Sequence, residues 1–171
     1  LSVYVLVILA RLDVRAFARA AAAGQAVGFS TQSSLAALPA MVEGAQQHLG
    51  VPPRVTGLVL PLAVSLFRFT SPAANLAVVL YLASFYGIEP SAGRLAAAVG
   101  VAVVVSLGAV SLPGQVSFFA SCVPISMALG VPIAGLPLLL AVESIPDIFR
   151  TVGNVTADVA VTGIVARRQA D

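Results

Sequence analysis

The sequence has few charged side chains and almost no residues suited to metal or redox chemistry. Of its 171 residues, 9% are charged, all nine basic residues are arginine, and there is one cysteine and one histidine. Soluble domains carry roughly 25% charged residues, so an ordinary soluble globular domain is excluded. A single cysteine excludes a disulfide scaffold. Nine arginines against seven acids are too few for a nucleic-acid interface, so no nucleic-acid partner is expected.

Apolar residues dominate what is present. They make up 59% of the chain, and the mean hydropathy is +1.02. No charged side chain occurs in residues 20–42, 69–88 or 95–142. A helical bilayer crossing needs about 20 apolar residues, so each run is long enough to enter or cross a membrane. The sequence therefore predicts an all-α membrane protein whose surroundings are the lipid bilayer.

Polar breaks inside two of these runs predict helical hairpins. Residues 30–34 read Ser-Thr-Gln-Ser-Ser, and residues 111–114 read Ser-Leu-Pro-Gly. Irregular backbone at membrane depth must be buried in protein or line a cavity, as in a re-entrant hairpin. The alternative for the first run is one continuous helix whose serines hydrogen-bond to its own carbonyl groups.

A third break is expected where Pro72 follows Arg68, which lies near the middle of an apolar segment. Pro72 has no amide hydrogen and disfavours the α conformation at Ser71, so the helix should unwind there. The segments expected along the chain are residues 1–10 as the end of a transmembrane helix, 14–49 as the first re-entrant hairpin, 55–86 as a broken transmembrane helix, 93–129 as the second re-entrant hairpin and 133–168 as the final transmembrane helix.

The arginines predict the orientation of this multi-pass protein. If the segments alternate across the membrane, Arg94 lies on one side and six other arginines lie on the opposite side. The positive-inside rule makes the arginine-rich side cytoplasmic, so the C-terminus is expected in the cytoplasm. The membrane itself is expected to be the plasma membrane, the inner membrane of a bacterium. The six are Arg11, Arg15, Arg19, Arg54, Arg167 and Arg168.

The final helix carries a polar stripe. Its members are spaced by four, three, four and four residues, which places them within an arc of roughly 80°. Ionisable groups inside a membrane are costly and need a partner or a solute. One interpretation is internal ion pairing, because Asp147 and Arg150 are three residues apart; the other is a solute site. The stripe comprises Glu143, Asp147, Arg150, Asn154 and Asp158.

Enzymatic chemistry is not indicated. His48 stands in the polar end of the first hairpin, and Cys122 stands in an apolar segment beside Ser121. General-base and metal chemistry need clusters of such residues, and the sequence has no glycine-rich phosphate loop. We therefore expect neither an enzyme nor a bound cofactor or metal.

The order of these segments, together with three motifs, resembles the dicarboxylate/amino acid:cation symporters, the sodium:dicarboxylate symporters and glutamate-transporter homologues. The motifs are Asp-x-x-Arg-Thr-x-x-Asn-x-x-x-Asp at 147–158, Ser-Thr-Gln-Ser-Ser-Leu-Ala-Ala-Leu-Pro at 30–39 and Ser-Leu-Gly-Ala-Val-Ser-Leu-Pro-Gly at 106–114. The resemblance implies the C-terminal part of a transport domain that moves like an elevator. It also implies a homotrimer held together by an N-terminal scaffold that these 171 residues do not include.

The resemblance implies a role for individual residues in binding a small acidic solute. Arg150 would pair with a side-chain carboxylate and Asp147 with an amino group, while Thr151 and Asn154 would bind the main-chain end. Helix N-termini at the hairpin tips attract anions, which suits a second carboxylate. The implied solute residues are Ser33, Ser34, Ser71, Glu143, Asp147, Arg150, Thr151 and Asn154.

The chain departs from the family at its cation sites. Phe67-Arg68-Phe69 stands where the family has Asn-Met-Asp, and phenylalanine offers no oxygen to a hard cation. We expect Arg68 to act as a tethered cation and sodium coupling to be altered, with sodium or a proton as the coupling ion. A second hypothesis is that Arg68 selects dicarboxylates. The remaining cation ligands implied are Ser65, Ser106, Leu107, Asn154 and Asp158.

Two function classes follow. The first is a secondary transporter, a symporter or exchanger, for acidic amino acids or four-carbon dicarboxylates. The second is a membrane sensor or scaffold that keeps the transporter fold without transporting. The retained Asp147, Arg150, Thr151 and Asn154 favour transport, whereas the lost cation ligands favour the second class.

Overall fold

The computed structural model describes residues 2–66, 70–108 and 114–170, and the regular elements in these ranges are all helical. The predicted all-α class is confirmed for this part of the chain. The chain divides into two compact units, of which the first joins residues up to 67 with residues from 151 onward and the second comprises 68–150. Each unit has its own apolar core.

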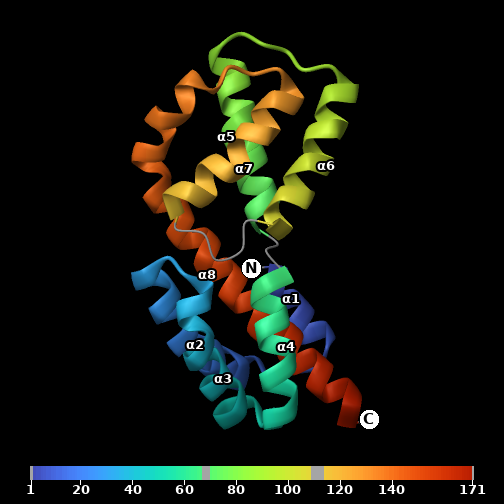
Figure 1. Cartoon of the computed structure of the whole chain (residues 1–171). Helices are drawn as coiled ribbons and strands as arrows, with labels where there is room; N and C mark the ends of the chain where they lie inside the picture. The colour runs from blue at the N-terminus through green and yellow to red at the C-terminus, as the bar shows by residue number, and fades with distance from the viewer. Residues whose placement is uncertain (1, 67–69, 109–113, 171) are drawn as a thin grey trace. The chain divides into compact units, whose positions relative to one another are not determined.

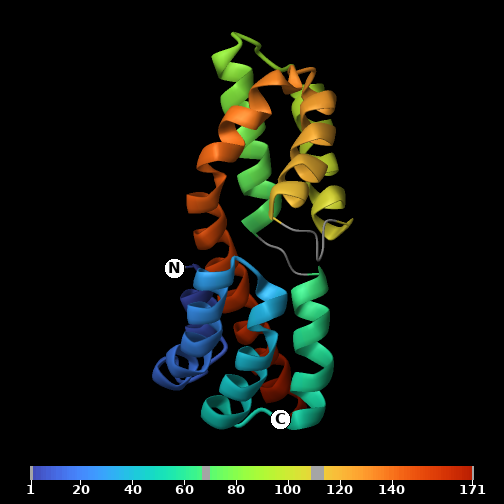
Figure 2. The same ribbon diagram turned by 60° about the vertical axis from the view of Figure 1, so that its left-hand side comes forward.

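A helical hairpin forms the centre of the first unit. Helices α2 (Val14–Thr31) and α3 (Ser34–Leu49) lie side by side (Figures 1 and 2). Gln32 takes the left-handed conformation at φ 53° and its amide donates to the carbonyl of Gly28, which ends α2. The Ser33 hydroxyl accepts from the Ala36 amide at 3.2 Å, which starts α3. The chain therefore breaks within the polar cluster, and the alternative of one continuous helix is wrong.

Small residues let α2 and α3 approach closely. A Cβ built on Gly44 would collide with the backbone carbonyl of Ala20, so only glycine fits at this crossing. A Cβ on Gly24 would lie 2.6 Å from the Met41 side chain. Close backbone approach through small residues is the usual way in which membrane helices pack. The crossing at Gly44 therefore fixes how the two arms of the hairpin fit together.

Other helices complete the core of the first unit. They are α1 (Ser2–Leu9), α4 (Pro53–Leu66) and the C-terminal half of α8 (Leu136–Ala170). The Arg167 guanidinium donates to the carbonyl of Arg11, just beyond the end of α1. The largest fully buried apolar side chains of this core are Val7, Phe17, Met41, Leu60, Val155 and Val159.

The second unit contains α5 (Thr70–Phe85), α6 (Ala92–Gly108), α7 (Gly114–Leu129), the short η1 (Ile133–Gly135) and the N-terminal half of α8. Helices α5, α6 and α7 pack against one another (Figure 1). Their core includes the fully buried side chains of Phe118, Ile125, Leu129, Leu136 and Val79.

The start of α5 corrects one expectation. Ser71 is helical, because Pro72 occupies the third position of α5, where the first turn has no partner for an amide hydrogen. Proline therefore begins this helix rather than unwinding it. The other residues of the two predicted breaks, 67–69 and 109–113, lie outside the described residues, and Arg68 is among them.

Exposed apolar side chains line the outer surface of the helices. On α8, Leu138, Val142, Ile145 and Phe149 are 59–75% exposed and recur at helical spacing. By length and composition, the stretch Pro53–Phe85 is long and apolar enough to cross a membrane. Shorter apolar segments lie in α6 and α7. These surfaces suit an apolar environment better than water.

Candidate functional site

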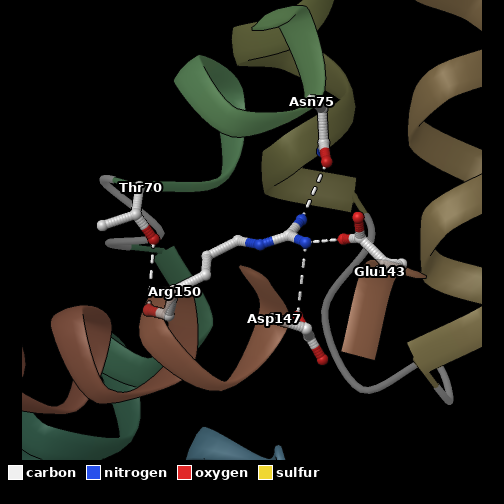
Figure 3. A network of polar contacts seen from close by, with 5 residues as sticks. All are labelled: Thr70, Asn75, Glu143, Asp147 and Arg150. Carbon is white, nitrogen blue, oxygen red and sulfur yellow. Dashed lines mark hydrogen bonds and ion pairs between the residues drawn. The ribbon is translucent and has the colours of Figure 1, made fainter. Parts of the chain in front are cut away.

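A buried polar network surrounds Arg150 in the second unit (Figure 3). The Arg150 side chain is 9% exposed. Its Nη2 atom pairs with Oε1 of Glu143 and lies 3.5 Å from Oδ1 of Asp147. Its Nη1 atom donates to Oδ1 of Asn75 at 2.8 Å. The guanidinium is thus held between the two carboxylates of α8 and the side-chain amide of Asn75 on α5.

The spacing on α8 explains why the three charged groups meet. Positions 143, 147 and 150 are separated by four and three residues, so their side chains lie over one face of the helix. The Thr70 hydroxyl donates to the backbone carbonyl of Arg150 at 3.2 Å, which ties the first turn of α5 to α8. The internal ion pairs allowed by the sequence are therefore present.

The charged groups of this network are shielded from water. Glu143 and Asp147 bring two negative charges to one guanidinium, and their side chains are 10% and 15% exposed. Charges this shielded from water interact more strongly than surface charges do, and they need hydrogen-bonding partners. The fixed, fork-shaped guanidinium of Arg150 is suited to bind a carboxylate through two parallel hydrogen bonds.

Sequence reasoning missed Asn75 and Thr70 as members of this network. Asn75 is 3% exposed and stands alone among apolar residues in the middle of α5. A single amide in such a helix is a signal, because an amide buried in an apolar environment requires a hydrogen-bonding partner. Helical periodicity could not reveal its partner, since Arg150 is 75 residues away in sequence.

The remaining predicted residues of the second unit lie apart from these hydrogen bonds. Ser71 is buried, and its hydroxyl makes no hydrogen bond with the described residues. The Ser106 hydroxyl is buried and donates to the carbonyl of Ala102 at 2.7 Å. Leu107 is 50% exposed. The expected cation ligands Ser106 and Leu107 thus lie on α6, with the hydroxyl turned to its own helix.

The other predicted residues belong to the first unit. Ser33 caps α3, and Ser34 is the first residue of that helix. The Ser65 hydroxyl donates to the carbonyl of Pro61 at 2.8 Å within α4. The polar residues of the C-terminal half of α8 that were expected to bind the solute or a cation are buried: Thr151, Asn154 and Asp158.

The first unit also contains a polar contact that the sequence did not suggest. The Gln25 amide of α2 donates to the Thr156 hydroxyl of α8 at 2.8 Å. That hydroxyl donates in turn to the carbonyl of Val152 at 2.6 Å. The contact fixes the rotation of α8 against the hairpin and thereby the direction of the residues around Thr156.

The cap at Ser33 leads to a first prediction. Replacing Ser33 by alanine is expected to lower the free energy of unfolding by about 1 kcal/mol, because the Ala36 amide loses its acceptor. Ser33→Asp should keep this stability, since aspartate is an equally good cap. Thermal unfolding of the full-length protein in detergent measures the effect.

Ser34→Ala is the matched control for this prediction. The Ser34 hydroxyl makes no hydrogen bond with the described residues, so its loss should change stability by less than about 0.5 kcal/mol. Equal effects of Ser33→Ala and Ser34→Ala would show that the cap does not stabilise the hairpin.

Among the described residues, no group of three or more His, Cys, Asp or Glu side chains could hold a metal ion. What the geometry offers is a buried arginine among carboxylates on an apolar helical fold, as in proteins that handle charged solutes in membranes. The family model of the sodium:dicarboxylate symporters matches residues 1–168, and the chain belongs to this family of transporters, not to a family of enzymes.

Similar proteins are themselves named as transporters. Human neutral amino acid transporter A is 32% identical over 82% of this chain and 26% of its own length. A putative sodium-dependent excitatory amino acid transporter of Caenorhabditis elegans is 27% identical over 94% of this chain and 32% of its own. The proton/sodium-glutamate symport protein of Bacillus subtilis is 29% identical over 82% and 32%. The chain spans about a quarter to a third of the length of these relatives.

Proposed function

We propose that the chain is the C-terminal part of the transport domain of a secondary transporter for acidic amino acids or four-carbon dicarboxylates. The observation that carries this proposal is the Arg150 guanidinium, buried and oriented by Glu143, Asp147 and Asn75. A planar cation held in place by neighbouring groups is well suited to recognise a carboxylate. The match to the sodium:dicarboxylate symporter family and the name of the Bacillus subtilis relative, a proton/sodium-glutamate symport protein, support transport of such solutes.

The two hairpins and the polar residues of α8 have specific roles in this proposal. The pair α2–α3 and the pair α6–α7 enter the bilayer as re-entrant hairpins. Arg150 binds a solute carboxylate, Asp147 binds an amino group where there is one, and Thr151 and Asn154 bind its other end. Ser33, Ser34 and Ser71 contribute hydroxyl groups.

The proposed mechanism requires a membrane and a scaffold. The transport domain moves like an elevator against the N-terminal scaffold, in a homotrimer in the plasma membrane with the C-terminus in the cytoplasm. The large apolar side chains exposed on α8, with Leu138 75% exposed and Phe149 70% exposed, support burial of this face in lipid or protein.

Coupling to sodium is proposed to be weakened. The side chains of the phenylalanines at 67 and 69 offer no oxygen ligand, and Arg68 between them brings a positive charge of its own. The oxygen ligands left for a cation are those of Ser65, Ser106, Asn154 and Asp158, with the backbone of Leu107. The alternative is that transport is driven by proton coupling through Glu143.

Uptake measurements test this proposal. Proteoliposomes holding the full-length protein are supplied with labelled aspartate or succinate, with and without an inward sodium gradient. We expect uptake of at least one solute and a rate that changes less than about twofold with sodium, because Arg68 replaces the charge of a bound cation. A preference for succinate over aspartate would support selection of dicarboxylates by Arg68.

Strong sodium dependence that survives Ser65→Ala would contradict the weakened coupling. It would mean that the remaining oxygen atoms suffice to bind the ion. Absence of uptake together with absence of solute binding would favour the second candidate, a sensor or scaffold that keeps the transporter fold. The replaced cation motif at 67–69 is the observation that favours this candidate.

A further inference from the structure

We propose that Glu143 is a specificity-determining residue that competes with the carboxylate of an acidic solute for Arg150. The inference rests on the proposed function, because it concerns how the same arginine receives a solute. A solute carboxylate binds Arg150 only after Glu143 has released the guanidinium. Affinity for anionic solutes is then lower than the arginine alone would provide.

The argument begins with the geometry of the guanidinium. An arginine side chain has five N–H donors in one plane, and a carboxylate binds best across two parallel donors. One such pair joins Nη1 and Nη2, and the other joins Nε and Nη2. Both arrangements use Nη2, which is the atom that contacts Glu143 and Asp147. A bidentate solute therefore meets a protein carboxylate at either edge.

Glu143 is the stronger of the two competitors. It makes the closer contact with Nη2, whereas the Asp147 oxygen lies 3.5 Å away. The Asn75 oxygen binds Nη1 at 2.8 Å and carries no charge, so it can hold the guanidinium in place when Glu143 moves. Asn75 thus orients Arg150 without competing electrostatically.

The distribution of charge makes the competition selective. In the described part of the second unit, the other charged residues are Glu89 and Arg94, which lie between and at the ends of α5 and α6 rather than in the network. A solute with net negative charge is repelled by Glu143, while a neutral zwitterion is not. Glu143 therefore lowers affinity for acidic solutes relative to neutral ones.

Binding measurements on the full-length protein test this inference. Kd values for labelled aspartate, succinate and serine are compared between the natural protein and Glu143→Gln. We expect Kd for aspartate and succinate to fall about tenfold and Kd for serine to change less than about twofold, because the repulsion removed acts on net charge. Glu143→Asp, one methylene shorter, should give a smaller decrease in the same direction. Glu89→Gln, an exposed acid outside the network, is the control and should change nothing.

The opposite result identifies a different role. If Glu143→Gln weakens binding of all three solutes equally, Glu143 only positions Arg150 and the competition is refuted. Unchanged Kd values in a folded variant also refute it. A natural protein that binds none of the solutes overturns the proposed function and this inference with it, whereas binding that Glu143→Gln fails to strengthen overturns this inference alone. If Glu143→Gln does not fold, the sign of the change in Glu143→Asp decides.

Discussion

Arg150→Ala is expected to reduce the affinity of the full-length protein for acidic solutes at least about a hundredfold, which corresponds to about 2.7 kcal/mol. Among the described residues of the Arg150 network, the guanidinium is the group that can neutralise a solute carboxylate. Equilibrium binding of labelled aspartate and succinate measures the loss. A sensor or scaffold of the same fold would be indifferent to this change, so the result separates the two candidate functions.

The alanine variant also leaves two carboxylates without their cation. Removing one partner of a buried ion pair destabilises a protein by about 3–5 kcal/mol, so loss of binding could come from unfolding. Arg150→Lys separates the two effects, since lysine keeps the charge and loses the planar fork. We expect Arg150→Lys to fold and still to bind acidic solutes at least about tenfold more weakly. Arg54→Lys, at an exposed position of α4, is the control.

Gly44→Ala is expected to be the most damaging single-methyl change in the first unit. The added Cβ would collide with the carbonyl of Ala20 and lie 3.0 Å from its carbonyl carbon, so one helix backbone must move. Overpacking of this kind lowers the free energy of unfolding by about 1–3 kcal/mol. Thermal unfolding and the yield of folded protein in detergent measure the effect.

Gly57→Ala is the matched control for Gly44→Ala. Gly57 lies within α4, and a Cβ there meets no atom within 4 Å. Alanine favours the helix by roughly 0.5–1 kcal/mol over glycine, so this variant should be slightly more stable. If the two variants lose stability equally, α2 and α3 do not cross closely at Gly44.

Much of the helical order could be predicted from the sequence because it depends on local chemistry. The cluster at 30–34 indicated a break, and the structure places a left-handed Gln32 and a capping Ser33 there. The expectation that Pro72 forces Ser71 out of the α conformation was wrong, since proline stops a helix in its interior but is tolerated in a first turn. The effect of a proline therefore depends on where the helix begins. The sequence alone did not show that α5 begins at Thr70.

The charged part of the network could be predicted, and its neutral part could not. Glu143, Asp147 and Arg150 share one helix, so spacing alone places them together. Asn75 reaches Arg150 from α5, and no local pattern reports contacts between residues 75 apart in the chain. The roles assigned to Ser33, Ser34, Thr151 and Asn154 remain predictions, because they depend on a solute rather than on the fold.

The single cysteine makes this chain convenient for mapping which residues water can reach. Cys122 is the only thiol in the sequence, and it is fully buried in α7. A water-soluble maleimide should therefore leave the natural sequence of this segment unlabelled. A cysteine placed at Ser30, which is exposed in the last turn of α2, would be the one reactive position among these 171 residues. Reagents added from either face of a sealed vesicle would report how deep the end of α2 lies.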